Sequence, residues 1–196
     1  MESDEIRMTE KESMELITSM INKAKDRVSE TGTLYLLWGW LILICCIVQF
    51  IGFHFFNYIN SYYIWFSTWI LVIYQFFYLG KRKNVNKVKS YTGEINGFVW
   101  LVFFICMMLV IFIGSYLKKY EIINPVLLVL YGMPTFLSGI ILKFKPLIIG
   151  GICCWALSVL SVFIPGDYQL LLTAAAVIAA WIIPGYILKQ NFKKVN

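Results

Sequence analysis

Five cysteines are the side chains of this sequence with the widest chemistry, because thiolates can hold soft metals or form disulfides. They occur as Cys45-Cys46, Cys106 and Cys153-Cys154, each near the middle of an apolar stretch. These stretches run in the same direction, so a shared soft-metal or redox site is one interpretation. Adjacent residues point about 100° apart on a helix, however, and neither pair has the CxxC spacing of such sites. We therefore interpret the cysteines as small apolar residues at helix contacts, and we predict no metal or cofactor site.

Catalytic groups are equally sparse. His54 is the only histidine, and it follows an apolar stretch, where we expect it to be a polar cap on a helix end. The sequence has no HExxH, GxSxG, P-loop or dinucleotide motif. The long apolar windows contain no Asp, Glu, Lys or Arg, so they offer no carboxylate pair and no proton relay. The sequence predicts no catalytic residue, and we expect a protein that is not an enzyme.

The strongest polar groups inside the apolar windows are the amides of Gln49 and Gln75. An unpaired amide in hydrocarbon is costly, so each should form a hydrogen bond across helices. A kink is expected near Gly132 and Pro134, because a proline inside a helix removes one backbone hydrogen bond. We expect packing roles for these four residues, and the alternative is that they line a substrate path.

The composition places the chain in a membrane. It is 60% hydrophobic and only 14% charged over 196 residues, whereas about a quarter of the residues of soluble domains are charged. A helix needs roughly 20 apolar residues to span a bilayer, and six windows approach that length. The six predicted spans are 34–53, 62–80, 98–117, 125–142, 147–164 and 168–188. Their unbroken apolar character predicts an all-α, six-helix transmembrane bundle and excludes a β-barrel.

The lysines and arginines predict the orientation. Fifteen of the seventeen fall in segments on one side: the N-terminal segment, the second and fourth loops, and the basic tail 189–196. The opposite side has only Lys118 and Lys119. Both termini are therefore expected in the cytoplasm of a multi-pass protein of the cell (inner) membrane.

Residues 1–33 form a separate region, here called the arm, which precedes the bundle at 34–188. Thr9 and Glu12 have capping-box spacing, and Gly32 fits a helix stop, so they predict a helix of about 22 residues. Its apolar stripe recurs at spacings of three and four residues. The stripe consists of Met14, Ile17, Ile21, Ala24 and Val28, and it is widened by Leu16 and Met20.

The arm has eight acidic and five basic residues, a net charge of −3, while the rest of the chain has +9. This charge disfavours lipid as its main partner, because inner leaflets are anionic. One interpretation is static packing of the arm, either under the bundle against the basic loop that begins with Lys81, Arg82 and Lys83, or on a second copy in a homo-oligomer. The other is a movable element that reports to a cytosolic regulatory protein. We expect no direct binding to nucleic acid.

Three stretches resemble a group of uncharacterised bacterial membrane proteins with six spans and a cytoplasmic N-terminal amphipathic helix. The stretches are "MTEKESMELITSMINKAKDRVSETGTLYLLWGWLI", "PTFLSGIILKFKPLIIGGI" and "IIPGYILK". The resemblance covers nearly the whole chain, and it implies no established activity and no assigned site residues. It also implies an association with small cytosolic DNA-binding regulators.

These observations favour a non-enzymatic membrane scaffold, sensor or regulatory partner that acts through its arm and basic loop. The alternative is a small permease, channel or transporter subunit. A permease should have a cavity near the middle of the bilayer, whereas a scaffold should have a filled core.

Overall fold

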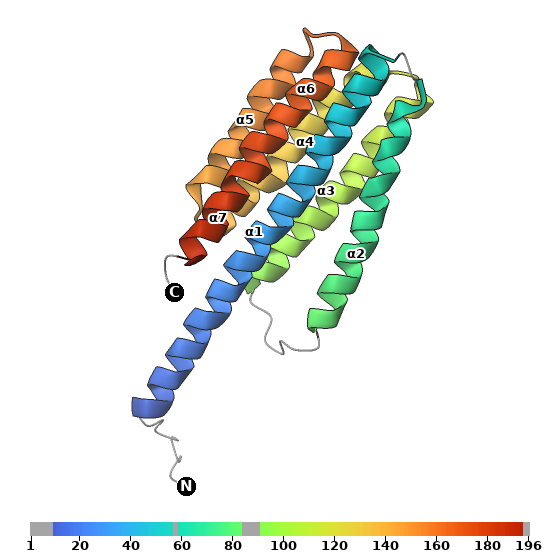
Figure 1. Cartoon of the computed structure of the whole chain (residues 1–196). Helices are drawn as coiled ribbons and strands as arrows, with labels where there is room; N and C mark the ends of the chain where they lie inside the picture. Colours follow the sequence, from blue (N-terminus) through green and yellow to red (C-terminus); the bar gives the residue numbers. More distant parts are fainter. Residues whose placement is uncertain (1–9, 57–58, 84–90, 194–196) are drawn as a thin grey trace.

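The part of the chain that the structure describes has helices and connecting turns but no strands, so it is all-α, as predicted. Figure 1 shows this computed structural model, which describes residues 10–56, 59–83 and 91–193. The helices are α1 (Glu10–His54), the 3-10 helix η1 (Ile59–Trp65), α2 (Phe66–Lys83), α3 (Tyr91–Tyr116), α4 (Tyr120–Ile141), α5 (Lys145–Ser161), α6 (Gly166–Val177), the π-helical turn η2 (Ile178–Ile182) and α7 (Ile183–Lys193). The last three follow one another without a break and form one rod, the terminal rod.

α1 is a single helix of 45 residues that contains both the arm and the first predicted span. The predicted stop at Gly32 is therefore wrong. Gly32 is helical and packs against α7, where a Cβ atom would lie 3.3 Å from the carbonyl oxygen of Gly185. Glycine is needed there for close approach of two backbones, not for the end of a helix. The residue before the helix, Thr9, lies outside the described residues.

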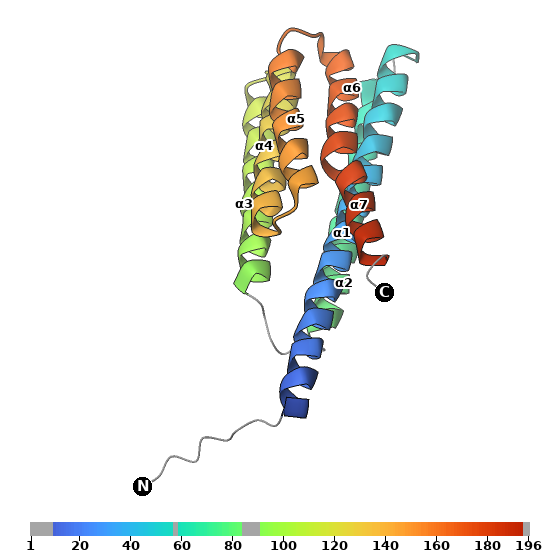
Figure 2. The ribbon, with the colours of Figure 1, turned by 90° about the vertical axis from the view of Figure 1, so that its left-hand side faces the viewer.

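The N-terminal part of α1 projects beyond the bundle. Figure 1 shows it running past the ends of α3 and α7, and Figure 2 shows the same projection after a quarter turn. We call this end of the bundle the arm end and the opposite end the far end. The arm helix does not fold back under the bundle.

Four helical stretches are long and apolar enough to cross a membrane: Gly32–His54, Gly93–Tyr116, Tyr120–Ile141 and Gly166–Gln190. They correspond to four of the six predicted windows, of which 98–117 and 125–142 each extend one residue further. The other two are shorter as helices. α5 has 17 residues, and α2 starts at Phe66 because residues 62–65 belong to the 3-10 helix, and it ends in three basic residues.

The bundle has two sides. Figure 2 shows α3, α4 and α5 together on one side and α1 with the terminal rod on the other. The core lies where these sides meet, and α4 and α5 make the most extensive contact of any two helices. α3 is different, since none of its apolar stretch Gly93–Tyr116 is buried. That exposure suits a helix whose surroundings are lipid.

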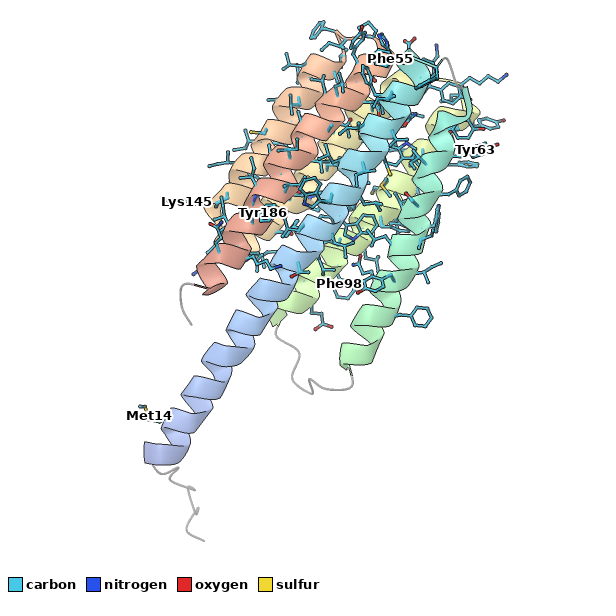
Figure 3. All side chains as sticks on the ribbon, viewed as in Figure 1. Met14, Phe55, Tyr63, Phe98, Lys145 and Tyr186 are labelled. Carbon is cyan, nitrogen blue, oxygen red and sulfur yellow. The ribbon has the colours of Figure 1, made fainter. Side chains whose placement is uncertain are left out.

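Exposed aromatic side chains gather at the far end, as the sticks of Figure 3 show around Phe55 and Tyr63. The most exposed of them come from three different connections: Phe55 and Phe56 after α1, Tyr116 at the end of α3, and Phe163 after α5. Tyrosine and tryptophan rings concentrate at membrane–water interfaces.

Two helices end in the same unusual way. The backbone N–H of Lys119 donates to Gly114 O at 2.9 Å, and the N–H of Phe144 donates to Gly139 O at 2.8 Å. This is the Schellman pattern, whose left-handed residue is usually glycine. Here it is Lys118 (φ 55°) and Lys143 (φ 51°). At both helix ends a lysine therefore has a left-handed backbone conformation, which costs more free energy for lysine than for glycine.

The contact between α5 and the terminal rod depends on Gly150. A Cβ atom on Gly150 would lie 2.6 Å from Ala180 Cα and 3.0 Å from Ala179 O, which are backbone atoms that cannot move aside cheaply. Gly150→Ala should therefore lower the free energy of unfolding by about 1–3 kcal/mol. The measurement is unfolding of the detergent-solubilised full chain with increasing SDS.

The matched control is Gly97→Ala in α3, where an added Cβ has no neighbour within 4 Å. That change should leave stability equal or raise it by up to about 1 kcal/mol, because alanine is the better helix former. Equal losses for the two variants would contradict close packing at Gly150.

Candidate functional site

Five aromatic rings meet where α1, α3, α4 and the terminal rod come together. The ring centroids lie 5.7 Å apart for Tyr35–Trp100, 5.5 Å for Trp100–Phe103, 5.6 Å for Phe103–Tyr131, 5.1 Å for Tyr131–Trp181 and 5.9 Å for Trp100–Trp181. Edge and tilted contacts of this kind add to the stabilisation that burial provides. We call these five residues the ring cluster. It connects both sides of the bundle.

A short chain of hydrogen bonds crosses the ring cluster. The indole Nε1–H of Trp181 donates to Thr135 Oγ1 at 2.9 Å, and that hydroxyl donates to Tyr131 O at 2.8 Å. Thr135 is fully buried. Because one hydroxyl serves as acceptor for the terminal rod and as donor within α4, it fixes the position of one helix against the other.

Two further polar groups border the ring cluster. Ser138 Oγ donates to Asn96 Oδ1 at 2.6 Å, which ties α4 to α3. The hydroxyl of Tyr35 is buried next to the polar side chains of Ser138 and Trp100, and it forms no hydrogen bond of good geometry with either of them. A buried hydroxyl without a well-aligned partner lowers stability.

Proline residues shape both helices that meet at Thr135. Pro134, in α4, leaves the carbonyl of Leu130 without its usual N–H donor, and Thr135 bonds to the next carbonyl along. In the terminal rod, the N–H of Ile183 donates to Ile178 O, five residues back, and the buried Pro184 follows. Single π-helical turns often occur at functional sites. Here the π-helical turn carries Trp181 into the ring cluster.

Gln49 and Gln75, for which the sequence predicts hydrogen bonds across helices, join α1 to η1 and α2, which together are called the α2 region. Gln75 Oε1 accepts from Trp38 Nε1–H at 2.6 Å, and Gln49 Oε1 accepts from Trp65 Nε1–H. Both amides thus form the cross-helix hydrogen bonds that the sequence predicts. Their hydrogen-bond partners are on α1 and η1, whereas Gly132 of α4 packs against α5, so these residues take part in separate contacts.

Gly132 and Pro134 lie in a tightly packed part of α4. A Cβ atom on Gly132 would lie 2.4 Å from Trp155 Nε1 and 2.9 Å from Gly151 O, and Pro134 is fully buried. The Trp155 indole donates to Val129 O at 3.2 Å. The Gly132 region is therefore occupied by the α5 side chain of Trp155.

The five cysteines are free thiols, and Cys45, Cys46 and Cys154 are buried. Cys45 Sγ lies 3.4 Å from Ser67 Oγ and 3.8 Å from Ile64 O, so it packs between α1 and the start of α2. Within residues 10–56, 59–83 and 91–193, no three His, Cys, Asp or Glu side chains are grouped so that they could hold a metal ion.

A buried polar ladder at the far end was not predicted. Ser158 Oγ donates to Pro125 O at 2.8 Å, Ser161 Oγ donates to Ser158 O at 2.7 Å, and Gln169 Nε2 donates to Ser161 O at 3.0 Å. The ladder joins α4, α5 and α6. Its signal in the sequence is weak, since two serines and one glutamine near helix ends resemble ordinary caps.

The residues predicted to bind a partner lie on the projecting part of α1 and at the end of α2, and none of them belongs to the ring cluster or to the polar ladder. Met14 is exposed on α1, as Figure 3 shows near the end of the projecting helix. Ile17 and Ile21 belong to the same helix by backbone, and Lys81, Arg82 and Lys83 form the last turn of α2. The side chains of these five residues, and the rest of the basic loop, lie outside the described part of the chain.

No known protein family, curated protein or solved structure matches this chain.

Thr135 offers a direct test of the hydrogen-bond chain through the ring cluster. Thr135→Val keeps the shape but removes the hydroxyl, which leaves the buried Trp181 N–H without an acceptor. We expect the free energy of unfolding to fall by about 1–3 kcal/mol. Unfolding of the full chain in detergent with increasing SDS measures the change.

Thr135→Ser is the matched control, because it keeps the hydroxyl and loses only a methyl group. It should lose clearly less stability than Thr135→Val. If the serine variant is the weaker of the two, methyl packing rather than hydrogen bonding holds α4 to the terminal rod.

Proposed function

We propose that this protein is a non-enzymatic regulatory docking protein of the bacterial inner membrane, with six spans and both termini in the cytoplasm. In this proposal the bundle anchors and orients α1, and the arm binds a cytosolic regulatory protein. The observation that carries the proposal is the continuity of α1, which runs unbroken from the far end of the bundle into the projecting arm.

A continuous helix makes the arm a rigid extension of the bundle instead of a tethered flexible segment. The helix of 45 residues is about 67 Å long at 1.5 Å per residue, which exceeds the roughly 30 Å of a bilayer core. The excess must stand in water on one side. An amphipathic helix held there can pair through its apolar stripe with an apolar groove or with a second helix.

The spacing of apolar residues along α1 supports the same proposal. Counting back in sevens from the buried Ile42 and Tyr35 reaches Val28, Ile21 and Met14 in the sequence. A repeat of seven residues is the pattern by which helices pair along a seam. The projecting part of α1 therefore continues a pattern whose bundle part is already buried against other helices.

The interior of the bundle favours docking over transport. Gln49, Gln75 and Gly132 are the residues that a permease would use to line a path. Each is engaged with a tryptophan of a neighbouring element: Trp65, Trp38 and Trp155. These contacts support a filled core at those positions, which is what a scaffold needs.

A topology of six spans has the N-terminal segment, the second and fourth loops and the C-terminal tail, which are rich in lysine, all on one side, at the arm end. α2 and α5 then count as the second and fifth spans, with Lys143, Lys145 and Lys189 exposed at the same end as the basic last turn of α2. An excess of basic residues on the cytoplasmic side supports this orientation.

Deletion of residues 1–28 tests whether the arm is a structural strut. Gly32, where α1 packs against α7, is kept in this deletion, and the helical residues that it removes, 10–28, belong to the part of α1 that projects beyond the bundle. The deletion should therefore change the free energy of unfolding of the bundle by no more than about 0.5 kcal/mol. Comparison of the truncated and full chains in detergent measures the change. A loss of several kcal/mol would mean that the arm supports the bundle, and docking would no longer be its main role.

Site-specific photo-crosslinking tests docking itself. A photoreactive amino acid at Ile17 or Ile21 of the full chain, in cells of the native host, should give an adduct with a second protein. The same amino acid at Asn22 or Asp26, on the opposite side of the predicted helix, is the matched control and should give much less adduct. Equal labelling from both sides, or adducts with lipid alone, would refute the proposed function. An adduct of two copies of this chain would identify the partner as a second copy.

A further inference from the structure

At the far end, α1 is tied to the terminal rod by a pair of ionisable side chains. His54 Nδ1 lies 3.2 Å from Asp167 Oδ2. His54 is the last residue of α1, and Asp167 lies in the first turn of α6. The pair thus joins two elements that are 113 residues apart in sequence, at the end of α1 opposite the arm.

Three aromatic rings contact the imidazole of His54, whose side chain is 38% exposed. Phe50 stacks on it with a centroid distance of 5.3 Å and an angle of 9° between the planes. Phe55 and Tyr168 present their rings at 5.3 Å and 5.5 Å. Ring faces attract cations, so the stacked face of Phe50 interacts more strongly with an imidazolium than with a neutral imidazole.

Protonation changes what holds the pair together. A neutral imidazole offers Asp167 one hydrogen bond, whereas an imidazolium adds the attraction of opposite charges. Imidazoles change charge between about pH 5 and pH 8. The contacts of His54 come from its own segment, through Phe50 and Phe55, and from α6, through Asp167 and Tyr168. The other charged groups at this end, Lys118, Lys119 and Glu121, form no ion pair with any residue the structure describes.

We propose that His54 and Asp167 form a proton-responsive latch that holds the far end of α1 and thereby sets the orientation of the arm. Acid strengthens the latch, and alkali leaves only the neutral hydrogen bond. The role of the arm as the output rests on the proposed function, whereas the latch itself does not.

The shape of α1 allows the latch to act at a distance. α1 has no break between His54 and Glu10. Near the arm end it meets the terminal rod at glycines: Gly32 faces Gly185, and Gly39 faces Ile182. Such contacts are close but have no directional bonds. α1 is thus held to the terminal rod by a bond at one end and by smooth contacts near the other, while its hydrogen bonds at Trp38 and Gln49 go to α2 and η1. A change in the His54 bond can therefore change the tilt of α1 against the terminal rod.

A double-mutant cycle with His54→Gln, Asp167→Asn and the combined variant tests the latch. Unfolding of each full chain in detergent is measured at about pH 5.5 and about pH 8, on either side of the range in which imidazoles ionise. The coupling between the two positions should be larger in acid, by up to about fivefold in the unfolding equilibrium constant. Both changes keep size and polarity, so all variants should fold. Equal coupling at the two pH values would overturn the latch.

Distance measurements test whether the latch moves the arm. Spin labels carried by unnatural amino acids replace Asn22 in the arm and the exposed Lys189 in α7, in the full chain in lipid vesicles. The distribution of distances should differ between acid and alkaline pH, and it should be the same at both in His54→Gln and in Asp167→Asn. If the labelled chain with His54 and Asp167 unchanged gives the same distance distribution at both pH values, the latch does not move the arm. This result needs no partner, so failure to find a docking partner would refute the proposed function and leave the latch standing.

Discussion

Indole N–H groups in an apolar interior need acceptors, and this requirement organises the bundle. An unpaired donor in an apolar interior is costly, so an indole packed between helices is stabilised by an oxygen on a neighbouring element. Four tryptophans do so, each from one element to another: Trp38 to Gln75, Trp65 to Gln49, Trp155 to Val129 O, and Trp181 to Thr135. Together these bonds fix α1 to the α2 region, α5 to α4, and the terminal rod to α4. The glycines then let the backbones approach closely enough for the bonds to form.

Apolar windows predicted where the helices run, because lipid leaves a backbone no alternative to the helix. The ends were less predictable. Residues 62–65 have the apolar character of a span but belong to a 3-10 helix. At the end of that helix, the carbonyls of Ile64 and Trp65 accept hydrogen bonds from the hydroxyls of Ser67 and Thr68. Gly32 has the chemistry of a helix stop, yet contact with Gly185 explains it better. A glycine that ends a helix and a glycine that admits a neighbour look the same in one sequence.

The polar contacts were predictable by type and not by partner. Amides in hydrocarbon must pair, so hydrogen bonds for Gln49 and Gln75 followed from the sequence, whereas their tryptophan donors depend on which helices are neighbours. The ring cluster was not foreseen, because Tyr35, Trp100 and Trp181 are far apart in sequence and have no shared motif. The π-helical turn was also missed. Its one local signal is Pro184, and proline near a helix end more often marks a simple kink or stop.

The length of α1 has a mechanical consequence. The stretch between Gly32, where α1 meets α7, and Glu10 is about 33 Å long at 1.5 Å per residue. If α1 pivots at Gly32 by about 10°, the tip moves by about 6 Å, roughly one helical turn. α1 is thus a lever whose short displacements inside the bundle become displacements at its tip that are large enough to bring a groove on another protein into or out of register.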